Sequence, residues 1–391
     1  MMEQILRNGK DLIWLLGCAL REELPGGGRL AQMDLDTVYR LAKEHSVATL
    51  AYYGLEKAIK SGETAPQADE ALLKQWKDER MKSLRRCILL NAEREKLLEQ
   101  LDQMGCWHMP LKGVILQNLY PKPEMRYMGD NDILFDLAYR SRLAELMKEN
   151  GYTEDSVKGE NHDVYFKQPL YVFEMHIFLF GTEDPDAVYR YYRDVESKLL
   201  KDGEGCGRRF SDEDFYIYMM AHGHKHFTKG GNGLRFLTDI FVYLERKEAS
   251  MDWDYIRAEM KKMEILEFSR EQEAFARKLF REGMEQPNAR EQELLLYYLR
   301  SGTFGHAETK VENMLMKHTT NGGKVTAWVK VKYLLGRLFP PVEFYEGYMP
   351  IAYRYKVLLP FAVVYRLIRA MLTSFGRLTK ELKTAVFYKQ K

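Results

Sequence analysis

The sequence predicts an α+β protein in which a small mixed sheet is flanked by N-terminal and C-terminal helical regions. Up to about residue 104, apolar residues recur at three- and four-residue spacing, as in LDTVYRLAKEHSVATLAYYGLEKAI, which indicates helices. Between about 105 and 182 this spacing gives way to short extended and alternating segments. The helical spacing returns after SDEDF. These three observations favour a small sheet embedded in helices.

The first predicted helical region spans residues 1–104. Glycine- and proline-containing segments interrupt it at PGGGR (25–29) and SGETAPQ (61–67). The segment DLIWLLGCAL superficially resembles a lipoprotein signal, but Asp11 breaks its short apolar run and charged residues follow at once. We therefore predict an amphipathic helix at this position.

The predicted sheet belongs to the region 105–210. CWHMPL is typical of a short extended segment, GVILQNLY of one or two helical turns, NDILF of a strand and LAYRSRLAELMKENGY of an amphipathic helix. DVYFKQPLYVFEMHIFLF alternates like a hairpin, with a break at Gln168-Pro169. The order strand, helix, strand, helix, hairpin predicts a small α+β unit.

Two further helical regions are predicted, at 211–323 and 324–391. Ser211 or Asp212 is expected to cap the first new helix. Loops are expected at TKGGNG (228–233), NGG (321–323) and FPPVE (339–343). No window reaches 18 uninterrupted apolar residues, so a membrane-spanning helix is not expected. A chain of 391 residues is long enough for two or three packed units.

Charge is unevenly distributed along the chain. The formal net charge of +2 is too small to indicate nucleic-acid binding by bulk electrostatics. The region 324–391 is nevertheless basic, with 13 Lys and Arg against 3 Glu, a net charge of +10. Aromatic residues are interleaved with these cations, which is compatible with a solvated helical cap, with contact to an anionic membrane surface, or with RNA binding, the least expected of the three.

The number and spacing of the cysteines indicate in which cellular compartment the protein is expected. The four cysteines are far apart and show no C-x-x-C spacing, so neither a zinc knuckle nor a disulfide framework is indicated. A cytoplasmic location fits best, and contact of the basic region with lipid would place the protein at the inner face of the membrane.

Candidate metal ligands occur in GDNDILF and YVFEMHIF. Side chains at i and i+2 of a strand share a face, so Asp130 and Asp132 would lie on one side with Cα atoms roughly 7 Å apart. Carboxylates so placed can hold two divalent ions about 3.5 to 4 Å apart, and oxygen ligands favour Mg²⁺ or Mn²⁺. Glu174 would supply a third acid, with His176 on the same strand face. Burial of these groups without a partner would cost a few kcal/mol, so the pattern indicates a ligand.

Residues upstream of these acids could bind phosphate. Gly113 allows a close turn of the backbone, and the first amides of the helix after it would be free to meet a phosphate. Lys112 adds a point charge, and Arg126 offers a planar fork to a phosphate or to a carboxylate of the site. A D-x-D pair alone is common in calcium loops and solvated turns, but these neighbours favour a catalytic site.

These motifs carry a resemblance to a known family. The run LKG…LYP…R…GDNDILF…FEMHIF is similar to the uncharacterised bacterial nucleotidyltransferases of the DNA polymerase beta-like superfamily, with the resemblance centred on residues 105–240. It implies a nucleotidyltransferase core at 105–210, with the helices of 211–323 closing a cleft. The implied reaction transfers a nucleoside monophosphate from an NTP to a hydroxyl acceptor and releases pyrophosphate, with Mg²⁺ or Mn²⁺ as cofactor.

The resemblance also implies roles for individual residues. Lys112 and Gly113 would hold the triphosphate, Asp130 and Asp132 would bind two metals, and Glu174 would bind the catalytic metal and ready the attacking hydroxyl. Glu174 and His176 match the acid-x-His pair of the family. The family's later helical segment corresponds to AHGHKHFTKGGNGLRFLTDI, which contains His222, His226, Arg235 and Asp239.

The later histidines have several interpretations. His222 and His226, spaced i and i+4, share a helix face that His224 does not, and no acidic helix neighbour completes a zinc site. They would line the nucleotide cleft, support it from behind, or belong to the core. Arg235 and Asp239 have the same spacing and are expected to pair with one another.

Two residues depart from the family pattern. Val114 follows Gly113 where a serine or glycine is usual, and Asn131 replaces an apolar residue between the acids. Asn131 indicates that the strand begins after Asp130 or that its outer face is wet. Both departures favour the alternative function, a catalytically inactive binding or sensor protein on the same scaffold. The acceptor is not indicated by the sequence.

Overall fold

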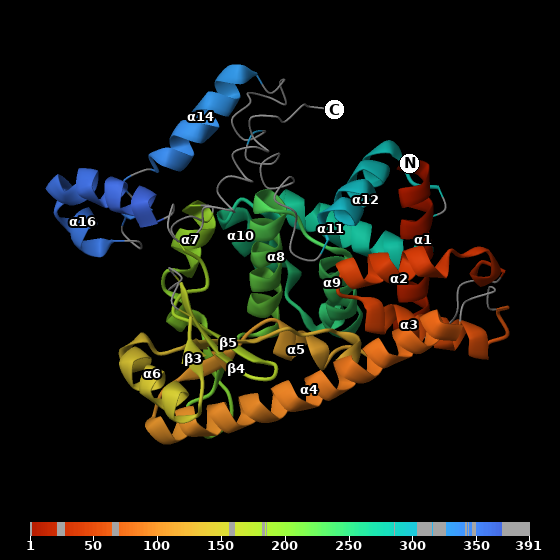
Figure 1. Cartoon of the computed structure of the whole chain (residues 1–391), viewed down its shortest axis with the longest axis horizontal. Helices are drawn as coiled ribbons and strands as arrows, with labels where there is room; N and C mark the ends of the chain where they lie inside the picture. The colour runs from red at the N-terminus through yellow and green to blue at the C-terminus, as the bar shows by residue number, and fades with distance from the viewer. Residues whose placement is uncertain are drawn as a thin grey trace.

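The computed structural model describes residues 2–369 except for 22–27, 65–69, 156–160, 182–183, 185, 285, 303–314, 316–325, 341, 343 and 346–348. Figure 1 shows a small sheet with one long helix along its lower side and a group of helices above it. This is the predicted α+β fold with helical flanks.

The N-terminal region is helical as predicted. Its helices are α1 (Met2–Leu20), α2 (Leu35–Glu44), α3 (Ala48–Lys60) and the long α4 (Glu70–Met104). Asp11, on α1, pairs with Arg29 at 2.9 Å. Trp76 of α4 is fully buried and donates its indole N–H to the carbonyl oxygen of Ala48 on α3 at 2.7 Å. The interruptions expected at 25–29 and 61–67 lie partly outside the described residues.

Five strands form the sheet, in the order β1-β2-β5-β4-β3. They are β1 (His108–Pro110), β2 (Asn131–Phe135), β3 (Thr153–Glu154), β4 (His162–Lys167) and β5 (Tyr171–His176). Strands β2 and β5 are parallel and the other neighbours antiparallel. Helix α5 (Gly113–Gln117) follows β1, and α6 (Arg140–Glu149) follows β2. The predicted order is therefore confirmed, with β3 as an additional short edge strand.

One face of the sheet packs on helices α4 and α6. Alternate residues of the strands are apolar and point to this face, as the period of two requires. The core that they form contains Leu97, Leu101, Ile133, Phe135, Leu143, Met147, Phe173 and Met175. The intervening residues of β2 and β5, which include Asp132, Glu174 and His176, consequently point to the opposite face.

Helices of the chain after residue 186 cover this opposite face. They are α7 (Asp186–Tyr192), α8 (Asp212–Lys229), α9 (Leu234–Lys247), α10 (Trp253–Lys262), α11 (Leu266–Arg277) and α12 (Ala289–Ser301); a small hairpin, β6 (Leu200–Lys201) and β7 (Arg208–Arg209), precedes α8. Ser211 caps α8 as predicted, because its hydroxyl accepts the amide of Asp214 at 3.0 Å. The expected loop at 228–233 separates α8 from α9.

The larger apolar core joins helices distant in sequence. It includes residues of α1 to α3 and residues of α8 to α12, for example Leu16 and Leu299. The first and third of the predicted regions thus contribute to one core, and the division at 104, 210 and 323 stays a prediction.

The C-terminal region has α14 (Ala327–Leu338), α16 (Pro350–Arg354) and further helical residues at 359–369. Figure 1 shows α14 and α16 apart from the main body. The loop expected at 339–343 follows α14, whereas the loop expected at 321–323 and the helix expected after 369 lie outside the described residues. Within the described ranges, no helix is both long and apolar enough to cross a membrane.

Candidate active site

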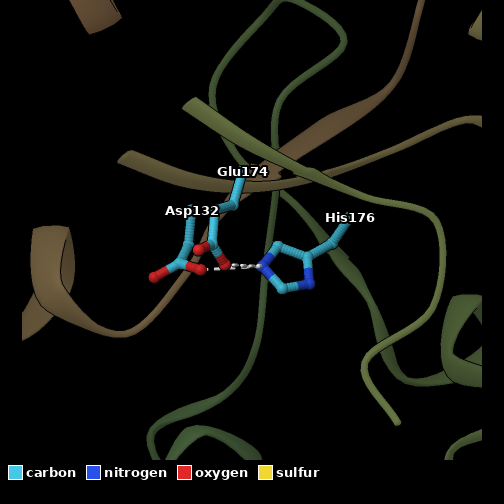
Figure 2. A group of neighbouring side chains, drawn as sticks. All are labelled: Asp132, Glu174 and His176. Atoms are coloured by element: carbon cyan, nitrogen blue, oxygen red, sulfur yellow. Dashed lines mark hydrogen bonds and ion pairs between the residues drawn. The ribbon is translucent and has the colours of Figure 1, made fainter. Parts of the chain in front are cut away.

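Two carboxylates and an imidazole meet on the open face of the sheet. The parallel register places Asp132 of β2 directly opposite Glu174 of β5, and His176 lies two residues further along β5 on the same face. One ligand atom from each of these residues lies within 4.8 Å of the other two. Figure 2 shows the three side chains pointing toward a common point. They form a group that could hold a metal ion.

Asp132 is bound by two neighbours. His176 Nε2 lies 2.7 Å from its Oδ1, and Lys112 Nζ lies 3.4 Å from the same oxygen. Burial would raise the pKa of Asp132, but Lys112 and His176 outweigh burial and hold this pKa well below its usual range. Asp132 is therefore ionised.

His176 is a neutral donor in this arrangement. Burial lowers the pKa of His176 despite the adjacent Asp132 carboxylate. The neutral ring then carries its proton on Nε2, where it donates to Asp132. Its Nδ1 is buried and has no hydrogen-bond partner among the residues described. His176 accordingly orients the carboxylate of Asp132.

Burial and neighbouring carboxylates both act on the other two acids, Glu174 and Asp130. Burial, followed by repulsion from Asp132 and Asp130, raises the pKa of Glu174 to about 8. Burial and repulsion from Asp132 likewise raise the pKa of Asp130. Glu174 therefore retains a proton at neutral pH, which a bound cation would replace.

Asp130 and Asn131 show where β2 begins. The strand starts at Asn131, so Asp130 lies in the bend before it and outside the close group of ligand atoms around Asp132. The expectation of a wet face at Asn131 is wrong, because this side chain is fully buried. Its amide donates to the carbonyl oxygen of Leu90 at 3.2 Å, and its oxygen accepts from Arg94 at 3.4 Å. The polar residue is thus explained by contacts with α4.

The turn at Lys112 and Gly113 differs in part from the expectation. Lys112 precedes the five-residue helix α5 and has a positive φ of 41°. The amides expected to be free are already paired: Val114 N–H donates to Leu111 O, and Ile115 N–H to Lys112 O. A Cβ at Gly113 would lie 2.8 Å from Nη1 of Arg126, so glycine is needed for the close approach of that guanidinium.

Arg126 forms a buried ion pair with Asp239 of α9. Its Nε and Nη2 donate to the two carboxylate oxygens at 2.8 and 2.9 Å, and Tyr120 donates to Oδ1 at 2.8 Å. The expected pairing of Arg235 with Asp239 is therefore wrong. Arg235 instead donates from Nη1 to the carbonyl oxygen of Tyr127 at 3.3 Å.

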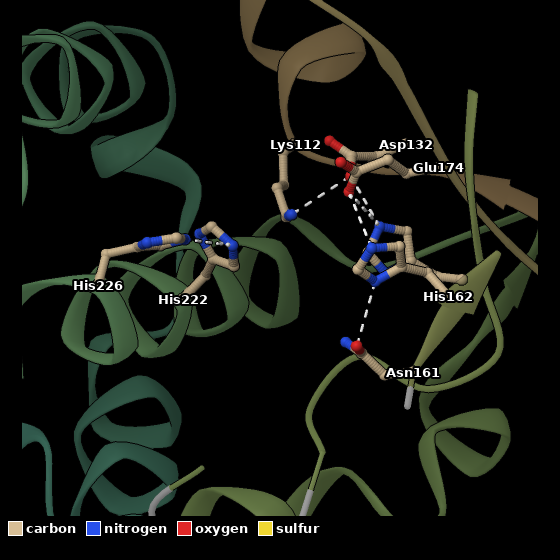
Figure 3. Close-up of polar contacts among 8 residues, drawn as sticks. Lys112, Asp132, Asn161, His162, Glu174, His222 and His226 are labelled. Atoms are coloured by element: carbon tan, nitrogen blue, oxygen red, sulfur yellow. Dashed lines mark hydrogen bonds and ion pairs between the residues drawn. The ribbon is translucent and has the colours of Figure 1, made fainter. Parts of the chain in front are cut away.

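His222 and His226 face the carboxylates from α8. Figure 3 shows them on the far side of Lys112 from Asp132 and Glu174. Their Nε2 atoms are 3.1 Å apart, which confirms the shared face. Burial and Lys112 lower the pKa of both rings, that of His226 to about 3. His224 packs on Phe268 instead, and across the described ranges these three histidines are not in any group able to hold a metal.

His162 was missed by the sequence reasoning. It pairs with His176 in the antiparallel register of β4 and β5, with its Nε2 3.9 Å from Oε2 of Glu174. Burial and His176 lower its pKa to about 4, and its Nδ1 contacts the side chain of Asn161 at 3.1 Å. A hairpin centred on Pro169 places residue 162 opposite residue 176, so the predicted turn contained this signal.

One cavity of about 400 Å³ collects these side chains. All ten sequence-predicted site residues line it: Lys112, Gly113, Arg126, Asp130, Asp132, Glu174, His176, His222, His226 and Arg235. Carboxylate oxygens are the donors that Mg²⁺ and Mn²⁺ prefer, and ligand atoms of Asp132, Glu174 and His176 lie within 4.8 Å of one another. The residues present therefore fit a divalent cation.

Comparison with known proteins agrees with this geometry. No curated protein and no solved structure gives a significant match. Residues 31–281 match the family described as uncharacterised nucleotidyltransferase. That match covers more than half of the chain and contains the sheet, the carboxylates and α8 to α11. The chain therefore belongs to this family of uncharacterised nucleotidyltransferases.

Proposed function

We propose that the protein transfers a nucleoside monophosphate from an NTP to a hydroxyl acceptor, releases pyrophosphate, and depends on Mg²⁺ or Mn²⁺. The observation that carries this proposal is the convergence of Asp132 and Glu174 from adjacent parallel strands in a cavity that Lys112 also lines. Family membership supports the reaction class.

The metal ligands proposed are Asp130, Asp132 and Glu174. A bound divalent cation would align the phosphates and neutralise charge that develops on them. His176 keeps Asp132 oriented toward the centre of the cavity through its 2.7 Å contact. Asp130, in the bend before β2, lines the same cavity.

The remaining residues of the cavity are proposed to bind the nucleotide and the acceptor. Lys112 and Gly113 contact the triphosphate, while Arg235 and the neutral His222 and His226 form the opposing wall. The acceptor oxygen bonds to the α-phosphorus as the bond to the bridging oxygen breaks. Pyrophosphate leaves with that electron pair. Glu174, whose own proton a bound cation would have displaced, accepts the hydroxyl proton.

Replacing Asp132 with Ala tests this proposal. The variant should bind an NTP analogue with Mg²⁺ weakly in calorimetry and release no pyrophosphate with any acceptor, with an unchanged circular dichroism spectrum. Asp202→Ala removes an acid whose side chain is 60% exposed and serves as control. Normal turnover by Asp132→Ala would refute the assignment. Nucleotide binding by the wild type without pyrophosphate release, across all acceptors, would favour the sensor alternative.

Contact of the C-terminal region with an anionic membrane is a second part of the proposal. Trp328, Val331 and Leu335 form one exposed face of α14, while Val329 and Tyr333 on its other side are buried. At 359–369, Phe361, Val364, Tyr365 and Ile368 have the i, i+3, i+4, i+7 spacing of a single helix face and are exposed. Trp328 and Phe361 are 70% and 72% exposed. Both helices thus present an apolar face that their own packing does not use.

The charge of this region supports lipid as the occupant of these faces. Residues 326–369 of the sequence include seven Lys and Arg against two Glu. Arg366 donates to the carbonyl oxygen of Leu338 at 2.7 Å and so joins the two helices. At the surface of an anionic membrane, the exposed apolar side chains would contact lipid tails and the neighbouring cations would contact the headgroups.

Liposome flotation of the full chain tests the membrane contact. The wild type should float with phosphatidylglycerol vesicles and much less with phosphatidylcholine vesicles, and Trp328→Glu with Phe361→Glu should abolish flotation. A matched control is the double variant Lys74→Glu with Lys77→Glu on exposed positions of α4. Equal flotation of the apolar-face variant and the wild type would refute lipid contact. If the wild type does not float but dimerises, and the apolar-face variant does not dimerise, the two faces bind a second copy of the chain instead.

A further inference from the structure

A second cavity, of about 520 Å³, adjoins the candidate active site. It is formed by α2, the start of α3 and the N-terminal half of α4, and Tyr127 lines both cavities. We call it the basic cavity; the residues that define it here are Lys43, Thr49, Lys82, Arg85, Arg86 and Tyr127. Neither the proposed nucleotide contacts nor the metal ligands include these residues.

The basic cavity carries excess positive charge. Glu79 also lines it and accepts from Lys43 and from Lys82, each at 3.2 Å. One carboxylate therefore faces four cations. Arg85 has no ion-pair partner among the described residues, and its side chain is exposed. An anion is the ligand that this charge would attract.

Uncompensated donors are present beside these cations. Thr49 is 4% exposed and lines the cavity, yet its hydroxyl has no hydrogen-bond partner among the residues that the structure describes. Nε of Arg86, which also lines the cavity, is buried without a hydrogen-bond partner among the residues described, which is unfavourable. Helix α3 begins at Ala48, and its N-cap residue Val47 makes no side-chain bond to the first turn. An oxyanion bound here would satisfy both the hydroxyl and the first amides of a 13-residue helix.

Arg86 links the basic cavity to the cavity of the candidate active site. Its Nη2 donates to the carbonyl oxygen of Gly129 at 3.1 Å, and its guanidinium lies 5.6 Å from the ring centroid of Tyr127. Gly129 lines the cavity of the candidate active site and directly precedes Asp130. The loop 127–129 is consequently shared, and a molecule anchored in the basic cavity lies next to the proposed metal ligands.

We propose that the basic cavity binds an anionic group of the acceptor, a phosphate monoester in the first place, while the acceptor's hydroxyl reaches the carboxylates. This inference rests on the proposed nucleotidyl transfer, and it names the acceptor as a phosphorylated alcohol. Four cations, a free hydroxyl and an uncapped helix start match the several oxygens of a phosphate better than the two of a carboxylate.

Calorimetry with inorganic phosphate tests the cavity itself. The titration is made with and without a saturating non-hydrolysable ATP analogue and Mg²⁺. We expect phosphate to bind in both cases, Arg85→Glu to weaken it by about tenfold or more, and Thr49→Val by roughly fivefold. Lys77→Glu reverses a charge on an exposed position of the same helix outside the cavity and should leave the affinity within about twofold.

Three outcomes of this titration would overturn the inference. They are unchanged phosphate affinity in Arg85→Glu, equal weakening in Lys77→Glu, and displacement of phosphate by the ATP analogue. Acetate in place of phosphate separates the two anion classes: stronger binding of acetate would overturn the phosphate assignment. Asp132→Ala should retain phosphate binding, so a failure of the proposed transfer does not affect this measurement.

Pyrophosphate release tests the acceptor role. Sugar phosphates and the same sugars without phosphate are compared as acceptors. Arg85→Glu should raise KM for the phosphorylated acceptors by about tenfold or more, with kcat and the KM for ATP nearly unchanged. Turnover that favours the uncharged sugars, or an equal change of KM for both kinds, would overturn the inference. If neither kind of acceptor supports pyrophosphate release, the proposed transfer is refuted. The phosphate titration would still show whether the basic cavity binds an anion.

Discussion

The ion pair between Arg126 and Asp239 allows a stringent test of how the loop before β2 is held against α9. Both side chains are buried, at 8% and 7% exposure, and two hydrogen bonds of 2.8 and 2.9 Å join them. Asp239→Ala removes the carboxylate and leaves the guanidinium in a site from which water is largely excluded. Arg126 keeps its proton even without the carboxylate that raises its pKa in the wild type, because the guanidinium group of arginine is not deprotonated in proteins.

The expected loss in free energy of unfolding is about 3 to 5 kcal/mol, the usual cost of leaving one member of a buried pair unpaired. Tyr120 loses a hydrogen-bond acceptor as well, although Thr238, 2.9 Å from its hydroxyl, remains. An exposed pair behaves differently. Asp36 and Arg40 are 65% and 66% exposed, so Asp36→Ala should cost no more than about 1 kcal/mol.

Urea unfolding followed by circular dichroism measures these differences. The double variant Arg126→Met with Asp239→Leu removes both charges at similar volume and should be more stable than Asp239→Ala. A loss below about 1 kcal/mol in Asp239→Ala would show that water reaches the guanidinium. A double variant less stable than the single one would show that packing, rather than the unpaired charge, dominates.

Three further predictions concern a glycine, a histidine and a helix cap. Gly113→Ala should cost about 1 to 3 kcal/mol in urea unfolding, because the new Cβ would meet Arg126, whereas the control Gly129→Ala meets nothing within 4 Å and should be near neutral. His226 has a folded pKa of about 3 against an ordinary 6.5, so the folded state binds fewer protons and stability falls as pH drops below 6.5. At pH 5 this residue should cost about 2 kcal/mol relative to pH 7, and an equal acid loss in His226→Gln would contradict the assignment. Asp34→Ala should cost about 1 kcal/mol, since Asp34 accepts the amide of Thr37 at 3.1 Å, while Asp34→Asn should retain most of the cap.

Local patterns in the sequence predicted the sheet well. Side chains of a strand alternate between its two faces, which predicts Asp132 and Glu174 on one face and Phe173 and Met175 on the other, as the structure confirms. The start of β2 at Asn131 was one of two alternatives. The second, a wet outer face, failed because α4 covers Asn131, and the sequence pattern alone could not show which helix packs there.

Contacts between distant segments were the part that could not be predicted. Arg126 and Asp239 are separated by 113 residues, and spacing on α9 favoured the neighbour Arg235 instead. The proximity of His162 to Glu174 depends on hairpin register, which the turn at Pro169 determines. The basic cavity arises where α2, α3 and α4 meet, and helical periodicity does not determine how such helices pack.

Helix α4 contributes to both apolar cores. Trp76, near its start, belongs to the larger core with α1 to α3, and Leu97 and Leu101, near its end, belong to the core under the sheet. With 35 residues it spans roughly 50 Å as a single rigid rod. Unfolding of either core alone would require α4 to unwind in part or to expose its apolar side chains to water. The core under the sheet is the smaller of the two, and its unfolding is thereby coupled to that of the larger helical core.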